Sequence, residues 1–366
     1  MRSRGNSSPL HINLLIFDMD GVLVDVSKSY RQAIQKTVQI YFETCLGREK
    51  GRGNLVTQED ISLFKSIGGF NNDWDLTSAL ILSLLSISGL PPLVRKKSFS
   101  TIGDGIQHLK AKSSVFRSRI NLLPGKKRLP PLVDRIRSCG GGLRGVRLAL
   151  RGTTGASWDG WVYRSGDIDR ENLIKRIFQE LYLGKQFASS TRLPPLFYKG
   201  PGYYLRERLL IPRPILTSLR KRVRMGIASG RPRFEALLAL KRFRLHSLFD
   251  SIVTLEECEE EERRILKKTG ARVKRTKPHP YPILRATRET GIHRVRCGYI
   301  GDVVDDMHAA RAAKKTLDII AIGFTRGQSN KKSSKEALSR AGADRVIEKP
   351  EDILQLVSGE WKVDSG

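Results

Sequence analysis

The sequence predicts an α/β fold, a parallel sheet with helices on its faces, and two observations lead to it. Beyond residue 222, apolar runs of strand length alternate with helical segments, which is typical of parallel strands joined by crossover helices. One more strand-length run, residues 12–17, lies near the beginning and has no partner of its own, so we assign it to the same sheet. The stretch between them, roughly residues 25–215, is therefore predicted to be an insertion after the first strand.

The individual elements follow from apolar spacing. The insertion has helical spacing near both of its ends, over residues 27–46, 57–68, 74–89 and 168–187. In the second part we predict strands over residues 223–229, 249–257, 296–302, 318–324 and 344–349. The helices that we expect between and after these strands cover residues 231–243, 281–290, 305–315 and 351–357.

Charge distinguishes the middle of the insertion from its ends. The chain has 66 lysines and arginines against 37 aspartates and glutamates, a net charge of +29. Between Arg95 and Arg151, fifteen basic residues face two aspartates, and glycines follow closely. We expect residues 95–166 to form an irregular, partly disordered addition with little apolar surface to pack. The remaining segments are then a catalytic core, residues 10–25 and 216–358, and a helical domain, residues 26–94 and 167–215.

Composition also bears on the compartment. The longest apolar stretch, Leu76 to Leu90, is shorter than the ~20 residues that a membrane span needs, and the apolar run near the N-terminus is too short for a signal peptide. The four cysteines share no CxxC spacing, which favours free thiols in a reducing compartment over a disulfide framework. We therefore expect a cytoplasmic protein with no membrane contact.

Polar side chains stand where several predicted strands end. Asp18 and Asp20 follow the first strand, Ser229 ends the run "GIAS", and Asp302 follows "GYIG" together with Asp305 and Asp306. Lys277, in "TKPHP", directly precedes a helix. Because the carboxyl ends of parallel strands share one edge of a sheet, where ligands bind, we expect these side chains to lie close together.

Each of these residue types suits phosphoryl chemistry. Paired carboxylates repel one another unless a hard cation such as Mg²⁺ binds between them. A carboxylate can attack phosphorus, and a second carboxylate can donate and accept the proton. Serine and lysine can bind the phosphoryl oxygens and stabilise the charge of the transition state.

The segments "FDMDGVLVD", "IASGR", "KPHP" and "GYIGDVVDD" resemble, in this order, the four motifs of the haloacid dehalogenase superfamily. The resemblance implies a Rossmann-like sheet with helices on both faces, Mg²⁺ as cofactor and a phosphoaspartate intermediate. By motif, Asp18 is similar to the nucleophile and metal ligand, and Asp20 to the general acid and base, whose backbone carbonyl also binds the metal. Asp302 is similar to the remaining metal carboxylate. The phosphate-binding positions correspond to Ser229, Gly230 and Lys277, and the supporting acid to Asp306 or Asp305.

An insertion after the first motif is where this superfamily places a helical cap. "GGFNNDWDLTSALIL" and "SGRPRFEAL" further resemble a branch close to phosphoglycolate phosphatases, some members of which lie beside histidine-biosynthesis genes. The resemblance implies a Mg²⁺-dependent phosphatase of a small phosphorylated metabolite.

Two alternatives stay open at this point. A phosphomutase of the same superfamily would use the same residues. A polyanion- or RNA-binding protein would contact its partner weakly through residues 95–151, where Phe99 and Phe116 are the only aromatics available for stacking on bases.

Overall fold

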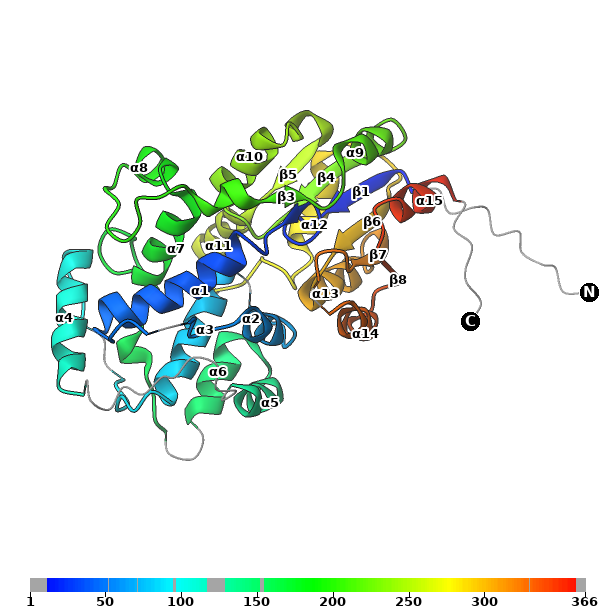
Figure 1. Ribbon diagram of the computed structural model, residues 1–366. Helices are drawn as coiled ribbons and strands as arrows, with labels where there is room; N and C mark the ends of the chain where they lie inside the picture. Colours follow the sequence, from blue (N-terminus) through cyan, green and yellow to red (C-terminus); the bar gives the residue numbers. More distant parts are fainter. Residues whose placement is uncertain are drawn as a thin grey trace, which may run out of the picture. The chain divides into compact units, whose positions relative to one another are not determined.

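The computed structural model describes residues 12–51, 53–70, 72–94, 97–116, 129–151, 155–328 and 330–359 of the 366 in the chain. Its contacts divide these residues into two units (Figure 1). The sheet unit comprises the described residues up to Asp25 and those from Arg208 onward, and the helical unit comprises Val26–Glu207.

The sheet unit contains a six-stranded parallel sheet in the order β5-β4-β1-β6-β7-β8. Its strands are β1 (Leu14–Phe17), β4 (Arg224–Ala228), β5 (Ser251–Val253), β6 (Arg296–Gly301), β7 (Asp318–Phe324) and β8 (Arg345–Ile347). A two-stranded antiparallel ribbon is formed by β2 (Val24–Asp25) and β3 (Arg208–Leu209). The predicted α/β class with a parallel sheet is confirmed, and so is the membership of the N-terminal strand, which pairs with both β4 and β6.

Helices cover both faces of this sheet (Figure 1). They are α9 (Arg213–Arg220), α10 (Arg233–Arg242), α11 (Leu255–Thr269), α12 (Tyr281–Glu289), α13 (Val304–Ala313), α14 (Lys331–Ala341) and α15 (Asp352–Ser358). Right-handed crossovers place α9 and α10 on one face and α12, α13 and α14 on the other.

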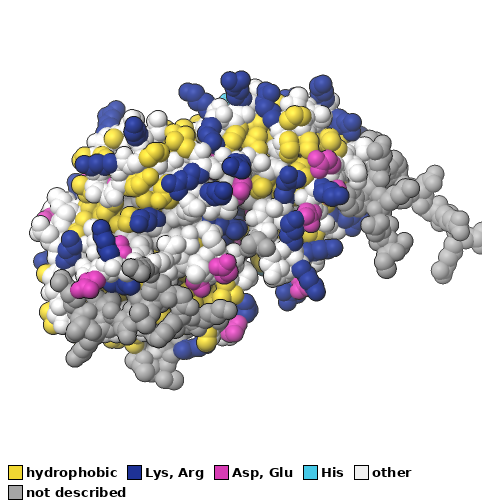
Figure 2. Space-filling view, viewed as in Figure 1, with side chains coloured by type: hydrophobic (Ala, Val, Ile, Leu, Met, Phe, Trp, Pro, Cys, Tyr) yellow, Lys and Arg dark blue, Asp and Glu magenta, His cyan; other side chains and the backbone are white. Residues whose placement is uncertain are grey.

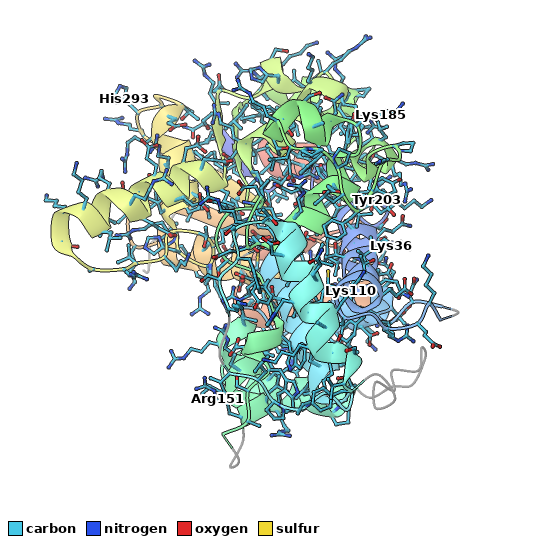
Figure 3. The ribbon with its side chains drawn as sticks, turned by 90° about the vertical axis from the view of Figure 1, so that its left-hand side faces the viewer. Lys36, Lys110, Arg151, Lys185, Tyr203 and His293 are labelled. Atoms are coloured by element: carbon cyan, nitrogen blue, oxygen red, sulfur yellow. The ribbon has the colours of Figure 1, made fainter. Side chains whose placement is uncertain are left out.

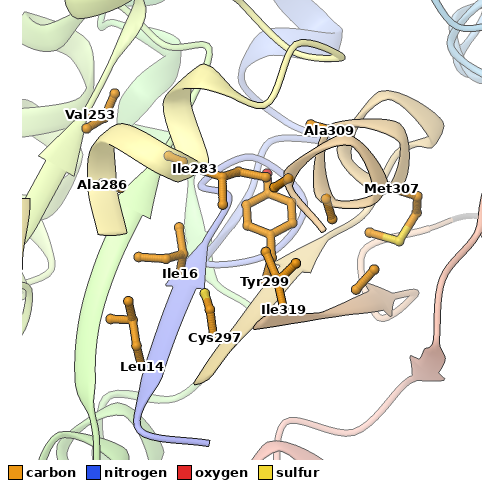
Figure 4. Close-up of a cluster of buried hydrophobic side chains, with 14 of the residues drawn as sticks. Leu14, Ile16, Val253, Ile283, Ala286, Cys297, Tyr299, Met307, Ala309 and Ile319 are labelled. Atoms are coloured by element: carbon orange, nitrogen blue, oxygen red, sulfur yellow. The ribbon is translucent and has the colours of Figure 1, made fainter. Parts of the chain in front are cut away.

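Successive side chains of β1 point to opposite faces of the sheet, so each contacts a different helical layer. Leu14 and Ile16 are fully buried in the cluster that the sheet forms with α12 and α13 (Figure 4). Phe17, on the other face, packs edge-on against Phe249, with ring centroids 6.0 Å apart. Burial on both faces explains why this strand has an unbroken apolar run before its first carboxylate.

The predicted strand over residues 249–257 is wrong in its second half. Only Ser251–Val253 is extended, and α11 begins at Leu255. The carboxylate of Glu257 accepts hydrogen bonds from the backbone N and the hydroxyl of Thr254, at 2.7 and 2.6 Å. The sequence Thr-Leu-Glu-Glu is therefore a capping box that starts a helix. The helices α9 and α14 were also absent from the prediction.

The helical unit contains the predicted helices near both of its ends. They are α1 (Tyr30–Ile40), continued by a π-helical turn at Tyr41–Cys45, then α2 (Gln58–Lys65), α3 (Asp73–Ser86), α7 (Leu173–Leu183) and the short α8 (Gln186–Thr191). The ring of Tyr30 on α1 stacks on Phe178 and Tyr182 of α7, with centroids 5.5 and 4.4 Å apart. This aromatic stack joins segments on either side of the basic stretch.

The basic stretch is not irregular in its described parts. It forms α4 (Ile102–Ser114), α5 (Pro130–Ser138) and α6 (Gly142–Arg151). These helices bury apolar side chains, and α6 packs on α3. The buried side chains are Ile102, Leu109, Val133, Ile136, Val146 and Ala149. The expectation of an add-on with little apolar surface is therefore wrong for these helices. Residues 95–96, 117–128 and 152–154, which that prediction also covered, lie outside the described residues.

The glycine run in this stretch serves a close approach between two chain segments. Gly141 and Gly142 have positive φ angles of 70° and 57°, and the backbone N of Gly142 donates to the carbonyl of Gly68 at 3.0 Å. A Cβ on Gly142 would lie 2.4 Å from the carbonyl oxygen of Gly69, so a side chain would push the segments apart. These glycines are thus part of a packed junction.

Basic side chains are dispersed over separate elements. On the face shown in Figure 2 they are scattered, and Figure 3 places Lys110 on α4 and Arg151 at the end of α6. Phe99, one of the two aromatics considered for stacking on bases, instead packs against Tyr163 and His108. Within the described ranges, no helix is long and apolar enough to cross a membrane.

Candidate active site

The candidate site lies at the carboxyl ends of β1, β4 and β6, all in the sheet unit. Phe17 pairs in register with Ile227 and with Ile300, so Asp18 leaves the sheet level with the ends of its two neighbouring strands. The chain turns back from β1 to β4 and later to β6 on its other side, which makes this edge the topological switch point of the sheet. Ser229 and Asp302 are the residues that directly follow β4 and β6.

Lys277 joins two of the predicted carboxylates. Its Nζ lies 2.9 Å from Oδ1 of Asp18 and 2.6 Å from Oδ1 of Asp306, and it also donates to the hydroxyl of Tyr299 at 3.1 Å. All four side chains are largely or fully buried. One ammonium group therefore brings together residues far apart in the sequence, from the loop after β1, the loop before α12 and the first turn of α13.

Of the two candidate supporting acids, Asp305 and Asp306, Asp306 is the one that contacts this lysine. Its Oδ1 also accepts from the hydroxyl of Tyr299 at 2.8 Å, and its Oδ2 accepts from the backbone N of Asp302 and of Val303 at 3.0 and 3.2 Å. Asp305, the alternative that the sequence left open, is only half-buried in the first turn of α13. Asp306 thus holds the backbone that positions Asp302 while it also holds Lys277.

Asp18 is electrostatically strained in the folded protein. The pKa of its carboxyl is raised from 3.8 to about 7. Burial is the largest cause, Lys277 opposes the rise, and the nearby carboxylates of Asp306 and Asp20 contribute to it. Burial disfavours the charged form of Lys277 as well, but Asp18 and Asp306 outweigh this and raise the pKa of Lys277 well above its usual value. The lysine therefore stays charged, and a further positive charge nearby would favour the ionised form of Asp18.

Carboxylate oxygens of Asp18, Asp302 and Asp306 lie within 4.8 Å of one another. Three carboxylates and one ammonium leave two negative charges in a buried space, which suits a divalent cation with oxygen ligands. Because Asp306 already accepts from four donors, Asp18 and Asp302 are the carboxylates of this cluster best placed to hold Mg²⁺.

A glycine shapes the turn that directly follows the two carboxylates of the first motif. Gly21 has a φ of +77°, and a Cβ there would lie only 2.0 Å from Oδ2 of Asp302. The chain turns back at once, since the backbone N of Gly21 donates to the carbonyl of Val24 at 2.8 Å. Asp302 therefore occupies space that only a glycine leaves open.

Two further residues belong to this site although the sequence reasoning missed them. Gln328, in the loop after β7, donates to Oδ2 of Asp302 at 2.7 Å and to its carbonyl at 3.2 Å. Arg231, directly after Ser229 and Gly230, pairs through Nε with Oδ1 of Asp20. The position of Arg231 beside the "SG" pair was a signal that could have been used, whereas nothing in the sequence around Gln328 indicates a role.

Ser229 is placed by local hydrogen bonds. Its backbone N donates to the carbonyl of Val253 at 2.9 Å, and its hydroxyl accepts from the backbone N of Arg231 at 3.2 Å. Gly230, between the two, completes the turn that leads from β4 to α10. This turn follows β4, the neighbour of β1, and so lies at the same edge of the sheet as Asp18.

Comparison with known proteins agrees with this architecture. Residues 213–317 match the family model described as haloacid dehalogenase-like hydrolase. A solved structural-genomics target shares the fold with a TM-score of 0.59 at 17% identity, over 95% of this chain and 100% of that one. The matched segment lies within the sheet unit, so this part of the chain is similar to haloacid dehalogenase-like hydrolases.

Two curated relatives are similar in sequence. The imidazoleglycerol-phosphate dehydratase of Phytophthora nicotianae is 25% identical over 350 residues, which are 95% of this chain and 51% of that protein. The phosphoglycolate phosphatase of Xylella fastidiosa (strain 9a5c) is 34% identical over 74 residues, 20% of this chain and 29% of that protein. The chain thus spans about half of the first relative and less than a third of the second.

Proposed function

We propose that the protein is a Mg²⁺-dependent phosphatase that hydrolyses a small phosphorylated metabolite through an aspartyl-phosphate. The observation that carries this proposal is the buried contact of Lys277 with Asp18 at the sheet edge that also holds Ser229 and Asp302. A lysine and a hydroxyl beside a buried carboxylate are the groups that bind a phosphoryl group next to its nucleophile. The 34% identity to a phosphoglycolate phosphatase supports the same reaction class.

The cation site fits this chemistry. Asp18 and Asp302, with the backbone carbonyl of Asp20, would hold Mg²⁺, which would offset the negative charge of the carboxylates and of the phosphoryl oxygens. The raised pKa of Asp18 supports the assignment, because a carboxyl that is hard to ionise by itself gains most from a bound cation.

The reaction follows from the positions of the two aspartates. A carboxylate oxygen of Asp18 attacks phosphorus and forms the acyl phosphate, while the bond from phosphorus to the ester oxygen breaks. Asp20 gives its proton to that oxygen and becomes the base that takes a proton from water. The water oxygen attacks phosphorus, inorganic phosphate leaves, and Asp18 regains its carboxylate. Lys277, fixed by Asp306 and Tyr299, neutralises the phosphoryl oxygens throughout.

The test is phosphate release from a panel of phosphorylated metabolites, with Mg²⁺ and with EDTA. We expect release that needs Mg²⁺ and that Asp18→Asn lowers by several orders of magnitude, since each ~1.4 kcal/mol of barrier is tenfold in rate. Asp305→Asn is the matched control, because Asp305 is a half-buried carboxylate at the same edge of the sheet. No release with any ester, or full activity in EDTA after dialysis, would contradict the proposal.

The same panel tests the activities in the names of the two curated relatives. It contains phosphoglycolate and imidazoleglycerol phosphate, the compounds in the names of the two curated relatives. Dehydration of the latter without phosphate release would indicate the activity named for that relative. A phosphomutase would instead move the phosphoryl group to a second position of a sugar phosphate and release little phosphate.

A further inference from the structure

Arg231 is one of the largest fully buried side chains among the residues that the structure describes, and its side chain is 0% exposed. A guanidinium taken out of water costs several kcal/mol unless an opposite charge and hydrogen bonds compensate for it. One compensating charge is Asp20, whose Oδ1 pairs with Nε of Arg231. The chain therefore buries an arginine against the carboxylate that we assign to proton transfer.

The backbone of Arg231 is held from two sides. Its N–H donates to the hydroxyl of Ser229 at 3.2 Å, and its carbonyl accepts from the backbone N of Leu255 at 2.9 Å. Pro232 follows and leads directly into α10. The guanidinium thus extends from the rigid turn after β4 to the loop after β1, and it fixes one oxygen of Asp20.

Asp20 needs such a partner. It lies in the short turn that ends at Val24, and its side chain keeps 26% of its surface exposed, so packing alone does not fix its orientation. A general acid has to be within hydrogen-bond reach of the leaving oxygen in a defined direction. A planar guanidinium with a fixed backbone gives a carboxylate that direction.

We propose that Arg231 is a positioning residue for Asp20: it orients the acid toward the leaving-group oxygen and acts through Asp20, not on the phosphoryl group. This inference rests on the proposed phosphatase function. It predicts that loss of the guanidinium harms protonation of the leaving group and leaves attack by Asp18 intact.

The variants are Arg231→Met, which removes the charge at similar length, and Arg231→Lys, which keeps the charge without the planar group. Arg233→Met is the matched control, because Arg233 stands two residues further on, is 48% exposed and pairs with Glu257 instead. Each variant is assayed with two phosphate monoesters, an activated aryl phosphate whose leaving group needs no proton and an alkyl phosphate whose leaving group does.

For Arg231→Met we expect kcat with the alkyl ester to fall about 10²-fold and kcat with the activated ester to change by no more than about threefold. Arg231→Lys should recover part of the loss, and Arg233→Met should match the wild type with both esters. In the Asp20→Asn background, Arg231→Met should add no further loss, because the acid through which it acts is already absent.

A second measurement does not need activity. Urea unfolding of the wild type, Asp20→Asn, Arg231→Met and the double variant forms a cycle, and we expect non-additive stabilities that report the ion pair. If Arg231→Met does not fold, Arg231→Lys takes its place in both measurements.

The outcomes separate the two proposals. An active wild type whose Arg231→Met variant loses both esters equally, or only gains a higher KM, would overturn the positioning role and indicate phosphate binding. Additive stabilities in the cycle would overturn it as well. A wild type that releases phosphate from neither ester with Mg²⁺, while the cycle still shows the ion pair, would overturn the proposed phosphatase function.

Discussion

Gly21→Ala tests the geometry of the cation site with one methyl group. The added Cβ would lie 2.0 Å from Oδ2 of Asp302, whereas ordinary contacts of a Cβ begin at 3.4 Å. Oδ2 of Asp302 would therefore have to move by about 1.4 Å, which would also disturb the hydrogen bond that it accepts from Nε2 of Gln328 at 2.7 Å. Since Mg²⁺ requires oxygen ligands at about 2.0–2.1 Å in near-octahedral geometry, a shift of this size removes Asp302 as a ligand.

The backbone contributes a smaller cost that a control can separate. Gly21 has a φ of +77°, where a residue with a Cβ costs about 1–2 kcal/mol. Gly270→Ala carries the same kind of cost, because Gly270 has a φ of +72°, but nothing lies within 4 Å of its Cβ. The two variants should lose similar stability from the backbone, and only Gly21→Ala should also displace a carboxylate.

The assay is Mg²⁺ binding by isothermal titration calorimetry, followed by Mg²⁺-dependent turnover. We expect Gly21→Ala to bind Mg²⁺ at least about 10²-fold more weakly than the wild type, which is the upper end of what loss of a supporting contact costs. Gly270→Ala should bind as the wild type does. A folded Gly21→Ala variant with unchanged Mg²⁺ affinity would refute the placement of Asp302 at the cation.

Three further predictions concern the same structure. Without metal, the folded chain keeps a proton on Asp18 at pH values where the unfolded chain has lost it. The free energy of unfolding of the wild type, relative to that of Asp18→Asn, should therefore fall by roughly 4 kcal/mol as pH rises from about 4 to 7. A difference between the two in urea unfolding that does not change with pH would contradict this. Gln328→Ala should raise the Mg²⁺ concentration for half-maximal activity about 10–100-fold with little change in kcat, and an unchanged requirement would exclude its role at the cation site. Gly142→Ala should destabilise the protein by about 2–4 kcal/mol, because a Cβ would meet the carbonyl of Gly69. Gly140→Ala, whose Cβ would have nothing within 4 Å, should cost only about 1–2 kcal/mol. Equal urea unfolding midpoints for the two variants would show that the close approach is absent.

The sequence was sufficient where local pattern and general topology agree. Apolar runs predict the sheet, and because parallel strands present their carboxyl ends at one edge, the sequence also indicates the proximity of Asp18 and Asp306. A position for Lys277 near these carboxylates could also be expected, because the loop that contains it directly precedes a helix, α12, between two strands of the sheet.

The glycine-rich stretch was misjudged for a physical reason. Glycines indicate either a flexible chain or a close approach, and which of these applies to Gly142 depends on Gly68 and Gly69, more than seventy residues earlier. A single sequence carries no mark of that pairing. The amphipathic pattern of α6 was present in the sequence, but the density of basic residues obscured it.

Arg231 and Gln328 were missed because their importance lies in their partners. An arginine near a helix start is usually exposed, as Arg233 is, and only burial against Asp20 distinguishes Arg231 from it. Gln328 stands in a loop with no motif, and it reaches the site through the side-by-side position of β7 and β6.

The central claim is that Asp18 becomes phosphorylated, and trapping the acyl phosphate tests it most directly. The enzyme is mixed with a substrate from the panel and Mg²⁺, quenched in acid within the first turnover, reduced with borohydride and examined by peptide mass spectrometry. We predict reduction at residue 18 in the wild type, a larger labelled fraction in Asp20→Asn, whose intermediate hydrolyses slowly, and none in Asp18→Asn. Phosphate release at full rate from an enzyme that is never labelled at Asp18 would contradict the account.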